Sequence, residues 1–289
     1  MLMTVIATTK TGPQRREPAT TSLSITAIAR EEPDYAQPAI PPMPLQRNAL
    51  TNVEFWADIQ LVSTEIEDAL AIFYTYEEIN LLAVEDGEIL RLLNEDALFW
   101  KVETYSLQTS LFMILGRIFD SAQDARSIHK VVSAVVGQPQ LFSKQALAVR
   151  KTTEGFPPDG LDQYIATAWA PTSPAELRYL KKELAKHSGR FEQVYRPIRN
   201  AIFAHRLLSN DQAAFKLFGE TSRVEVAKIL DFLHDLIDAI ESLYVNGTRP
   251  ELGKRSYTEY NQRIRAGAQH VLRKLATGSD SVARQQNPA

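Results

Sequence analysis

Three side chains within seven residues are the best suited to chemistry in this sequence: Arg199, Asn200 and His205. A neutral histidine with a pKa of about 6.5 can take a proton from a hydroxyl group. Arginine stays charged and binds a phosphate through two parallel N–H donors. These residue types suit acid–base chemistry at a phosphate group, which needs no metal or other cofactor. In such chemistry His205 is the general base or acid, Arg199 the phosphate clamp and Asn200 an orienting donor.

The spacing of Arg199 and His205 restricts how they can share a substrate. At about 100° per residue, six residues place them roughly 240° apart around a regular helix. A substrate must then lie in a groove that the long arginine reaches from one side, or be held by residues from two copies of the helix. Two structural interpretations stay open: His205 is a core or interface histidine, and Arg199 pairs with an acidic residue of the segment 51–104.

A helix is predicted to carry these residues. The stretch beginning Ser173-Pro174-Ala175-Glu176 is a strong helix start, with a serine cap, proline at the first position and glutamate three residues on. Pro197 lacks a backbone N–H, so we expect a kink or a restart just before Arg199, with free N–H groups that suit an anion. The apolar positions that follow a 3–4 residue rhythm are Leu177, Leu180, Leu184, Phe191, Val194, Ile198 and Ala201.

The motif Arg199-Asn200-Ala201-Ile202-Phe203-Ala204-His205 resembles the signature of the HEPN superfamily. Its surroundings, from Tyr195 to Arg206, are similar to the HEPN branch named for a U-type phage abortive-infection protein. An upstream block, Leu115-Gly-Arg117-Ile-Phe-Asp120 with Ser127-Ile-His129-Lys130, resembles the second helix of that branch and the turn after it. The likeness covers roughly residues 50–248.

This resemblance implies an antiparallel helical bundle that dimerises through its motif helices, so that two copies of the motif line one cleft. It implies metal-independent endoribonuclease activity in phage defence or as a toxin, with RNA, tRNA included, as the substrate. His205 of the second copy would complete an acid–base pair, and an antitoxin or another defence protein would be a further partner. Because some HEPN domains are inactive, the alternative is a non-catalytic module that binds RNA, a nucleotide or a protein partner. A purely structural helical dimer is a third interpretation.

Five residues around the motif have both a functional and a structural interpretation. Arg196 and Arg206 flank the motif and are expected to position phosphates if RNA binds. Tyr195 either stacks on a base or fills the core. Arg117 and Asp120 lie one helical turn apart, so they either form a local ion pair or line the cleft that the resemblance implies.

Helical signals dominate the remaining chain, so the expected fold class is all-α. Thr51-x-x-Glu54 is a capping box, and Asn246-Gly247 is a plausible left-handed helix end. The stretch 150–172, rich in glycine and proline, is expected to be a loop with at most one helical turn. The further helices expected are 51–84, 97–119, 127–136, 222–246 and a short one at 257–275. The apolar stripe expected in the fourth of these is Ile229, Leu230, Leu233, Leu236, Ile237, Ile240 and Leu243.

Charge and proline divide the chain. Residues 1–44 hold 7 of the 15 prolines and are expected to be a disordered tail, followed by a helical domain at 45–248 and a basic extension at 249–289. Residues 51–104 carry a net charge of −11 and residues 173–208 one of +5. These two segments either pack together and neutralise each other, or the basic one faces a polyanion.

Composition excludes several classes of site. The sequence has no cysteine, which removes disulfides, thiolate nucleophiles and cysteine zinc sites and suits the cytoplasm. No secretory signal is expected, and no apolar run approaches the roughly 20 residues of a membrane span. Asp231, His234, Asp235 and Asp238 have the spacing of a metal site, but a solvated polar face is the better explanation for them.

Overall fold

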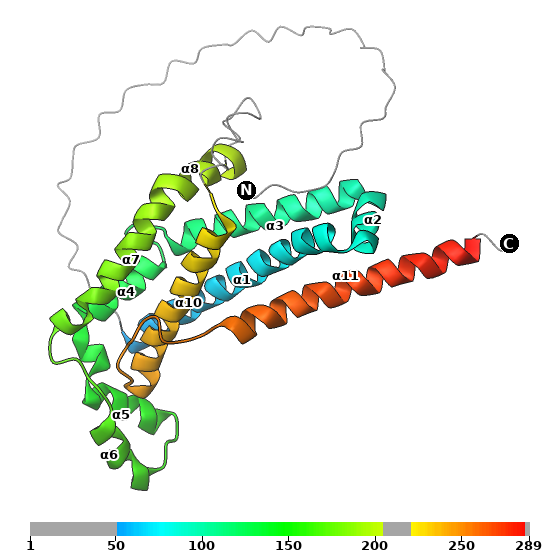
Figure 1. The fold of residues 1–289 in the computed structure, drawn as a ribbon. Coiled ribbons are helices and arrows are strands. Elements are labelled where there is room, and N and C mark those ends of the chain that lie inside the picture. The colour runs from blue at the N-terminus through cyan, green and yellow to red at the C-terminus, as the bar shows by residue number, and fades with distance from the viewer. Residues whose placement is uncertain (1–50, 205–220, 287–289) are drawn as a thin grey trace, which may run out of the picture. The chain divides into compact units, whose positions relative to one another are not determined.

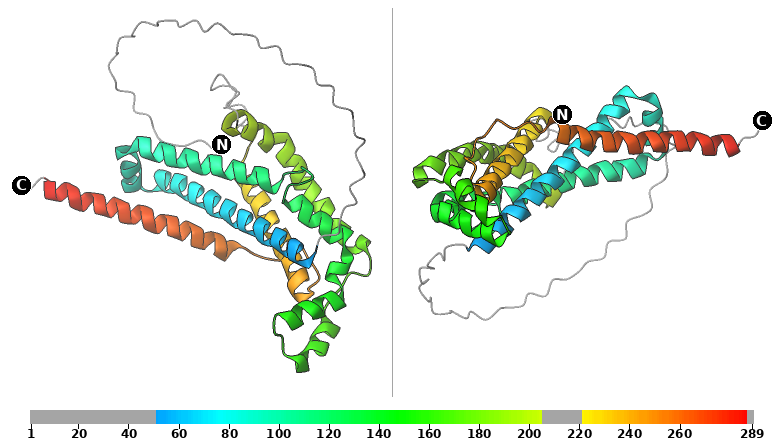
Figure 2. Two further views of the ribbon diagram at one scale, coloured as in Figure 1. Left: turned by 180° about the vertical axis from the view of Figure 1, so that it is seen from behind. Right: turned by 90° about the horizontal axis from the view of Figure 1, so that it is seen from below.

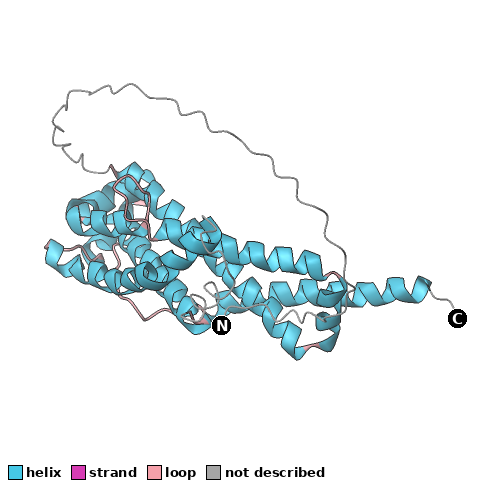
Figure 3. Ribbon diagram, turned by 90° about the horizontal axis from the view of Figure 1, so that it is seen from above, coloured by secondary structure: helices cyan, strands magenta, loops and turns pink. Residues whose placement is uncertain are grey.

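The computed structural model describes residues 51–204 and 221–286. Within these two ranges every regular element is helical and no strand occurs (Figure 3), so the all-α prediction is confirmed. The expected tail, residues 1–44, lies outside the described residues. No helix in the described part of the chain is long and apolar enough to cross a membrane.

The long first helix, α1 (Asn52–Glu85), is the element against which most others pack. It begins with the predicted capping box: Glu54 N donates to Thr51 Oγ1 at 3.2 Å, and Thr51 N donates to Glu54 Oε2 at 2.9 Å. A short helix, α2 (Gly87–Glu95), reverses the chain, and α3 (Ala97–Ile118) returns along α1 in the opposite direction (Figure 1). This antiparallel pair forms the centre of the bundle.

The next three helices are α4 (Ile128–Gly137), α5 (Lys144–Thr153) and α6 (Pro158–Thr167). The expectation of a loop at 150–172 was therefore wrong, because α5 continues to Thr153 and α6 contains ten residues. Pro158 occupies the first turn of α6, where a backbone N–H has no partner within the helix and the fixed φ of proline fits. A 3₁₀ turn, η1 (Pro139–Phe142), connects α4 with α5.

The helix α10 (Arg223–Asn246) closes the main core, and every residue of its predicted apolar stripe is buried. It ends at Gly247, whose φ of 63° and ψ of 32° are left-handed, and Gly247 N donates to Leu243 O at 3.0 Å. The predicted cap is confirmed. The start is right in position but differs in detail, because the Ser222 side chain caps no backbone N–H.

The C-terminal helix α11 (Thr258–Gln286) is much longer than the short helix expected at 257–275. It packs along α1 and α2 (Figure 2), and its buried residues Leu272 and Ala276 share a hydrophobic cluster with both. Arg265 donates to Glu77 and, at 3.0 Å, to Glu78, which is 1% exposed. The C-terminal segment is therefore part of the bundle.

The acidic α1 is neutralised by several elements. Arg265 of α11 contacts its second half, Arg117 of α3 pairs with Glu65, and Arg126 and Lys130 pair with the buried Asp58. In the described part of the chain, no ion pair joins α1 to the basic segment that begins at residue 173. In the described parts of the two segments, mutual neutralisation through ion pairs with α1 is therefore not what the structure shows.

Candidate functional site

The backbone of the motif segment is helical but irregular. A 3₁₀ turn, η2 (Pro174–Leu177), leads into α7 (Arg178–Arg190), so the α-helix begins later than predicted and Ser173 caps no N–H. Two π-helical stretches, η3 (Phe191–Tyr195) and η4 (Arg199–Ala204), follow on either side of α8 (Arg196–Ile198). Wider π turns are a common response to a broken helical hydrogen-bond ladder and occur often at functional sites.

Pro197 is the cause we assign to this irregularity, because it cannot donate to the ladder. The helix type changes at Arg199, but the Arg199 N–H is not free as expected. Arg199 keeps right-handed helical angles, φ −52° and ψ −51°, and its own N–H donates to Arg196 O. The chain accommodates the proline by widening the helix. An anion at this position therefore depends on side chains.

Arg199 lies against α3 at the position of Gly116. A Cβ built on Gly116 would lie 2.6 Å from Arg199 Nε and 2.7 Å from its Cδ. Nε is buried and has no hydrogen-bond partner, and within the described ranges no carboxylate of residues 51–104 pairs with Arg199. The interpretation of Arg199 as the partner of an acid on α1 is thus not supported. The Arg199 guanidinium is half-buried.

The other two motif residues cannot be placed in the same way. Asn200 is half-buried on the π-helical stretch that also carries Arg199. His205 and Arg206 lie outside the described residues, so the distance between Arg199 and His205 stays a prediction. Arg196, one turn before Arg199, is partly exposed and pairs with Glu192 at 2.7 Å.

Arg117 and Asp120 do not form the local ion pair considered from the sequence. Arg117 Nε instead contacts Glu65 Oε1 of α1 at 2.5 Å. Asp120 lies two residues after the end of α3, and its Oδ1 accepts a hydrogen bond from Ala122 N at 2.9 Å. The carboxylate therefore stabilises the turn after the helix, as an aspartate commonly does. Both side chains keep exposed surface near the end of α3.

Tyr195 belongs to the hydrophobic core. It is 0% exposed, its ring lies 6.2 Å from that of Phe112, and its hydroxyl donates to Glu225 Oε2 at 2.9 Å. Burial raises the pKa of Tyr195 well above its ordinary value. A base cannot stack on a ring with no exposed surface, so the core interpretation is the one that the structure supports.

A residue without an assigned role, His129 of α4, makes a further contact between the upstream block and the helical segment that carries the motif. Its Nε2 lies 3.2 Å from Ser188 Oγ, and Ser188 donates its own proton to Leu184 O at 2.9 Å. Burial lowers the pKa of His129, with Glu192 nearby raising it and Lys181 lowering it. Sequence spacing gave no signal for this contact, because its partners are 59 residues apart.

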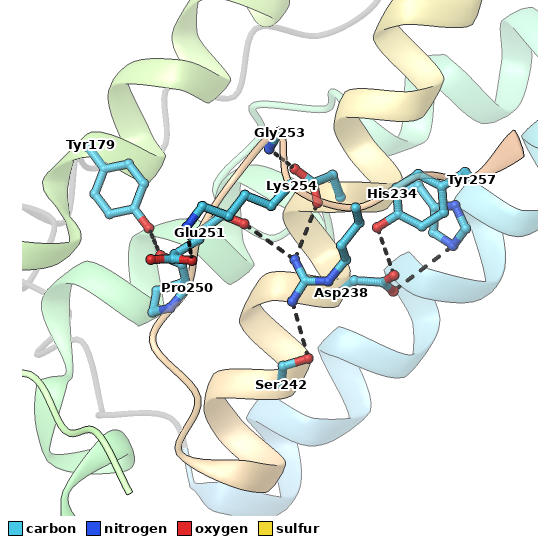
Figure 4. A network of polar contacts seen from close by, with 11 residues as sticks. Tyr179, His234, Asp238, Ser242, Pro250, Glu251, Gly253, Lys254 and Tyr257 are labelled. Atoms are coloured by element: carbon cyan, nitrogen blue, oxygen red, sulfur yellow. Dashed lines mark hydrogen bonds and ion pairs between the residues drawn. The ribbon is translucent and has the colours of Figure 1, made fainter.

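The stripe Asp231, His234, Asp235 and Asp238 is largely covered, which corrects the expectation of a solvated face. The segment that leads into α11 lies over it (Figure 4). Asp235 accepts hydrogen bonds from Gly253 N at 2.6 Å and Arg255 Nη1 at 3.2 Å, and Tyr257 donates to Asp238 at 2.8 Å. These groups hold the C-terminal segment on α10.

A comparison with protein families identifies the family of this chain. The family model HEPN_AbiU2, described as AbiU2, matches residues 59–270. A search of curated proteins and a search of solved structures each found no match. The matched range contains both sequence blocks, the whole of α10 and the first part of α11.

Proposed function

Since the chain belongs to the AbiU2 family of HEPN proteins, we propose that it is a metal-independent endoribonuclease that acts in phage defence or as a toxin. The observation that carries the proposal is the state of Arg199. This guanidinium lies where the upstream block meets the motif segment, and it has no carboxylate partner in the described ranges. A half-buried arginine that no carboxylate of the described residues pairs with suits a phosphate group, which accepts two parallel N–H bonds from arginine.

The proposed reaction is an attack of the ribose 2′-oxygen on the adjacent phosphorus, with departure of the 5′-oxygen of the next nucleotide. His205 takes the proton of the 2′-hydroxyl, and an acid returns a proton to the leaving oxygen. Arg199 stabilises the charge that develops on the phosphorus oxygens, and Asn200 orients the phosphate. We assign the acid to His205 of a second copy of the chain, which requires a homodimer formed through the motif helices.

The direct test is cleavage of single-stranded RNA and of tRNA by the purified protein in buffer with a chelator. We expect cleavage by the native chain and its loss in Arg199→Ala and His205→Ala. Arg178→Ala, an exposed arginine at the start of α7, is the matched control and should cut like the native chain. Equal cutting by Arg199→Ala and the native chain would contradict the assigned clamp.

RNA binding without cleavage would favour the alternative, a non-catalytic HEPN module. Both functions predict RNA affinity that falls steeply as salt rises, because phosphate contacts release counterions. Growth inhibition on expression separates them, because a nuclease should be toxic and Arg199→Ala should relieve that toxicity. Analytical ultracentrifugation of the native chain tests the dimer independently.

A further inference from the structure

A buried glycine in a helix is unusual unless another group needs its space. Gly116 is the glycine of α3, between Leu115 and Arg117, and it is buried. Glycine is the least favourable residue in a helix interior apart from proline. At this position the space is used by a side chain of another element, since Arg199 occupies the place where a Cβ would be.

The contact is too close for a Cβ at position 116 unless the Arg199 side chain moves. The Cβ position of Gly116 is 2.6 Å from Arg199 Nε, 2.7 Å from Cδ and 3.0 Å from Cζ. All three atoms belong to one flexible side chain, and no backbone atom is among the nearest neighbours. An alanine at 116 would therefore displace the guanidinium of Arg199 and leave the two helices largely in place.

The burial of Arg199 Nε also indicates which edge of the guanidinium would bind a phosphate. Nε is buried without a partner, which is costly for a donor. With Nε held against α3, the two terminal Nη groups are left as the parallel donor pair. A phosphate would then be bound end-on through both Nη groups.

We propose that Gly116 is a positioning residue for Arg199: its missing Cβ lets the guanidinium lie against α3 and present both Nη groups to the RNA phosphate. This inference rests on the proposed ribonuclease function. A side chain at position 116 should displace the guanidinium of Arg199 from the phosphate. A displacement of about 1 Å at such a group lowers turnover by roughly a hundredfold.

The test is a double-mutant cycle of Gly116→Ala and Arg199→Ala, with RNA cleavage and the thermal unfolding midpoint as separate measurements. Gly116→Ala should lower kcat/KM by roughly tenfold to a hundredfold. In the Arg199→Ala background the same change should leave the residual activity unaltered and raise the unfolding midpoint, because the clash is gone and alanine favours the helix. Gly267→Ala, in the interior of α11 with open space around it, is the control and should keep kcat/KM within about twofold.

Two results would overturn the inference. One is RNA cleavage by Gly116→Ala at the rate of the native chain. The other is that Gly116→Ala lowers the unfolding midpoint equally in the native chain and in the Arg199→Ala variant, which would mean that the added Cβ clashes with a residue other than Arg199. The cycle measured by unfolding needs no RNA. If the native chain cuts no RNA, the proposed function fails, whereas a midpoint that Gly116→Ala raises less in the native chain than in the Arg199→Ala background still establishes the contact.

Discussion

The hydroxyl of Tyr195 donates a 2.9 Å hydrogen bond to Glu225 Oε2 and so joins the motif segment to the first turn of α10. Arg190 donates to the same carboxylate, to Oε2 at 3.0 Å and also to Oε1. The hydrogen bonds from Arg190 and Tyr195 both lower the pKa of Glu225, and that from Arg190 has the larger effect. Glu225 follows Ser222 at capping-box spacing, but its carboxylate makes a contact between helices instead.

Tyr195→Phe should therefore destabilise the fold. The ring still fills the core, but the hydrogen bond to a charged acceptor is lost, and we expect the free energy of unfolding to fall by about 1–2 kcal/mol. Urea unfolding measures this change. A phenylalanine variant as stable as the native chain would mean that Arg190 alone satisfies Glu225.

Arg265→Ala should be more damaging than most substitutions on α11. It leaves Glu78, 1% exposed, and its neighbour Glu77 without their counter-charge. Removal of one partner of a buried pair is strongly destabilising, and at this partial exposure we expect about 2–3 kcal/mol. Arg263→Ala, at an exposed position of the same helix, should change stability by less than about 0.5 kcal/mol. Equal effects of the two substitutions in urea unfolding would show that α11 does not depend on this ion pair.

Local signals in the sequence predicted much of the fold. The capping box of Thr51 and Glu54 and the left-handed Gly247 were identified because each depends on a few neighbouring residues. The same reasoning failed for Pro157 and Pro158. A proline ends a helix when it lies inside one but starts a helix when it lies in the first turn, and composition alone does not distinguish the two cases.

The candidate site was only partly predictable, because its decisive contacts join residues far apart in the sequence. Arg199 was identified from its motif, but its position on Gly116 depends on how α3 packs beside the motif segment. The contact of His129 with Ser188 depends on the packing of α4 on α7. Periodicity indicates which face of a helix is buried but not which helix covers it.

Gly247→Ala tests the end of α10. The backbone there has φ 63°, and a Cβ would lie 2.7 Å from Leu147 Cδ2 and 2.8 Å from Ala168 Cβ. Both the positive φ and the crowding oppose alanine, so we expect a loss of more than about 1 kcal/mol. Gly267→Ala has neither problem and should raise stability by about 0.5–1 kcal/mol, because alanine favours a helix interior. A stable Gly247→Ala variant would contradict the left-handed cap.

Two half-buried histidines should make stability depend on pH. The ring of His187 stacks on that of Phe232, with the ring centroids 3.8 Å apart. Burial lowers the pKa of both His129 and His187 below the ordinary value of 6.5. The unfolded chain therefore binds these protons at a higher pH than the folded protein does. The two neutral histidines contribute fully to the free energy of unfolding above about pH 6.5, and this contribution is lost as the pH falls below that value. His187→Phe keeps an aromatic ring against Phe232 without a titrating group, so it should reduce the loss of unfolding free energy between about pH 7 and pH 5. A variant with the same loss as the native chain would show that His187 protonates equally well in the folded state.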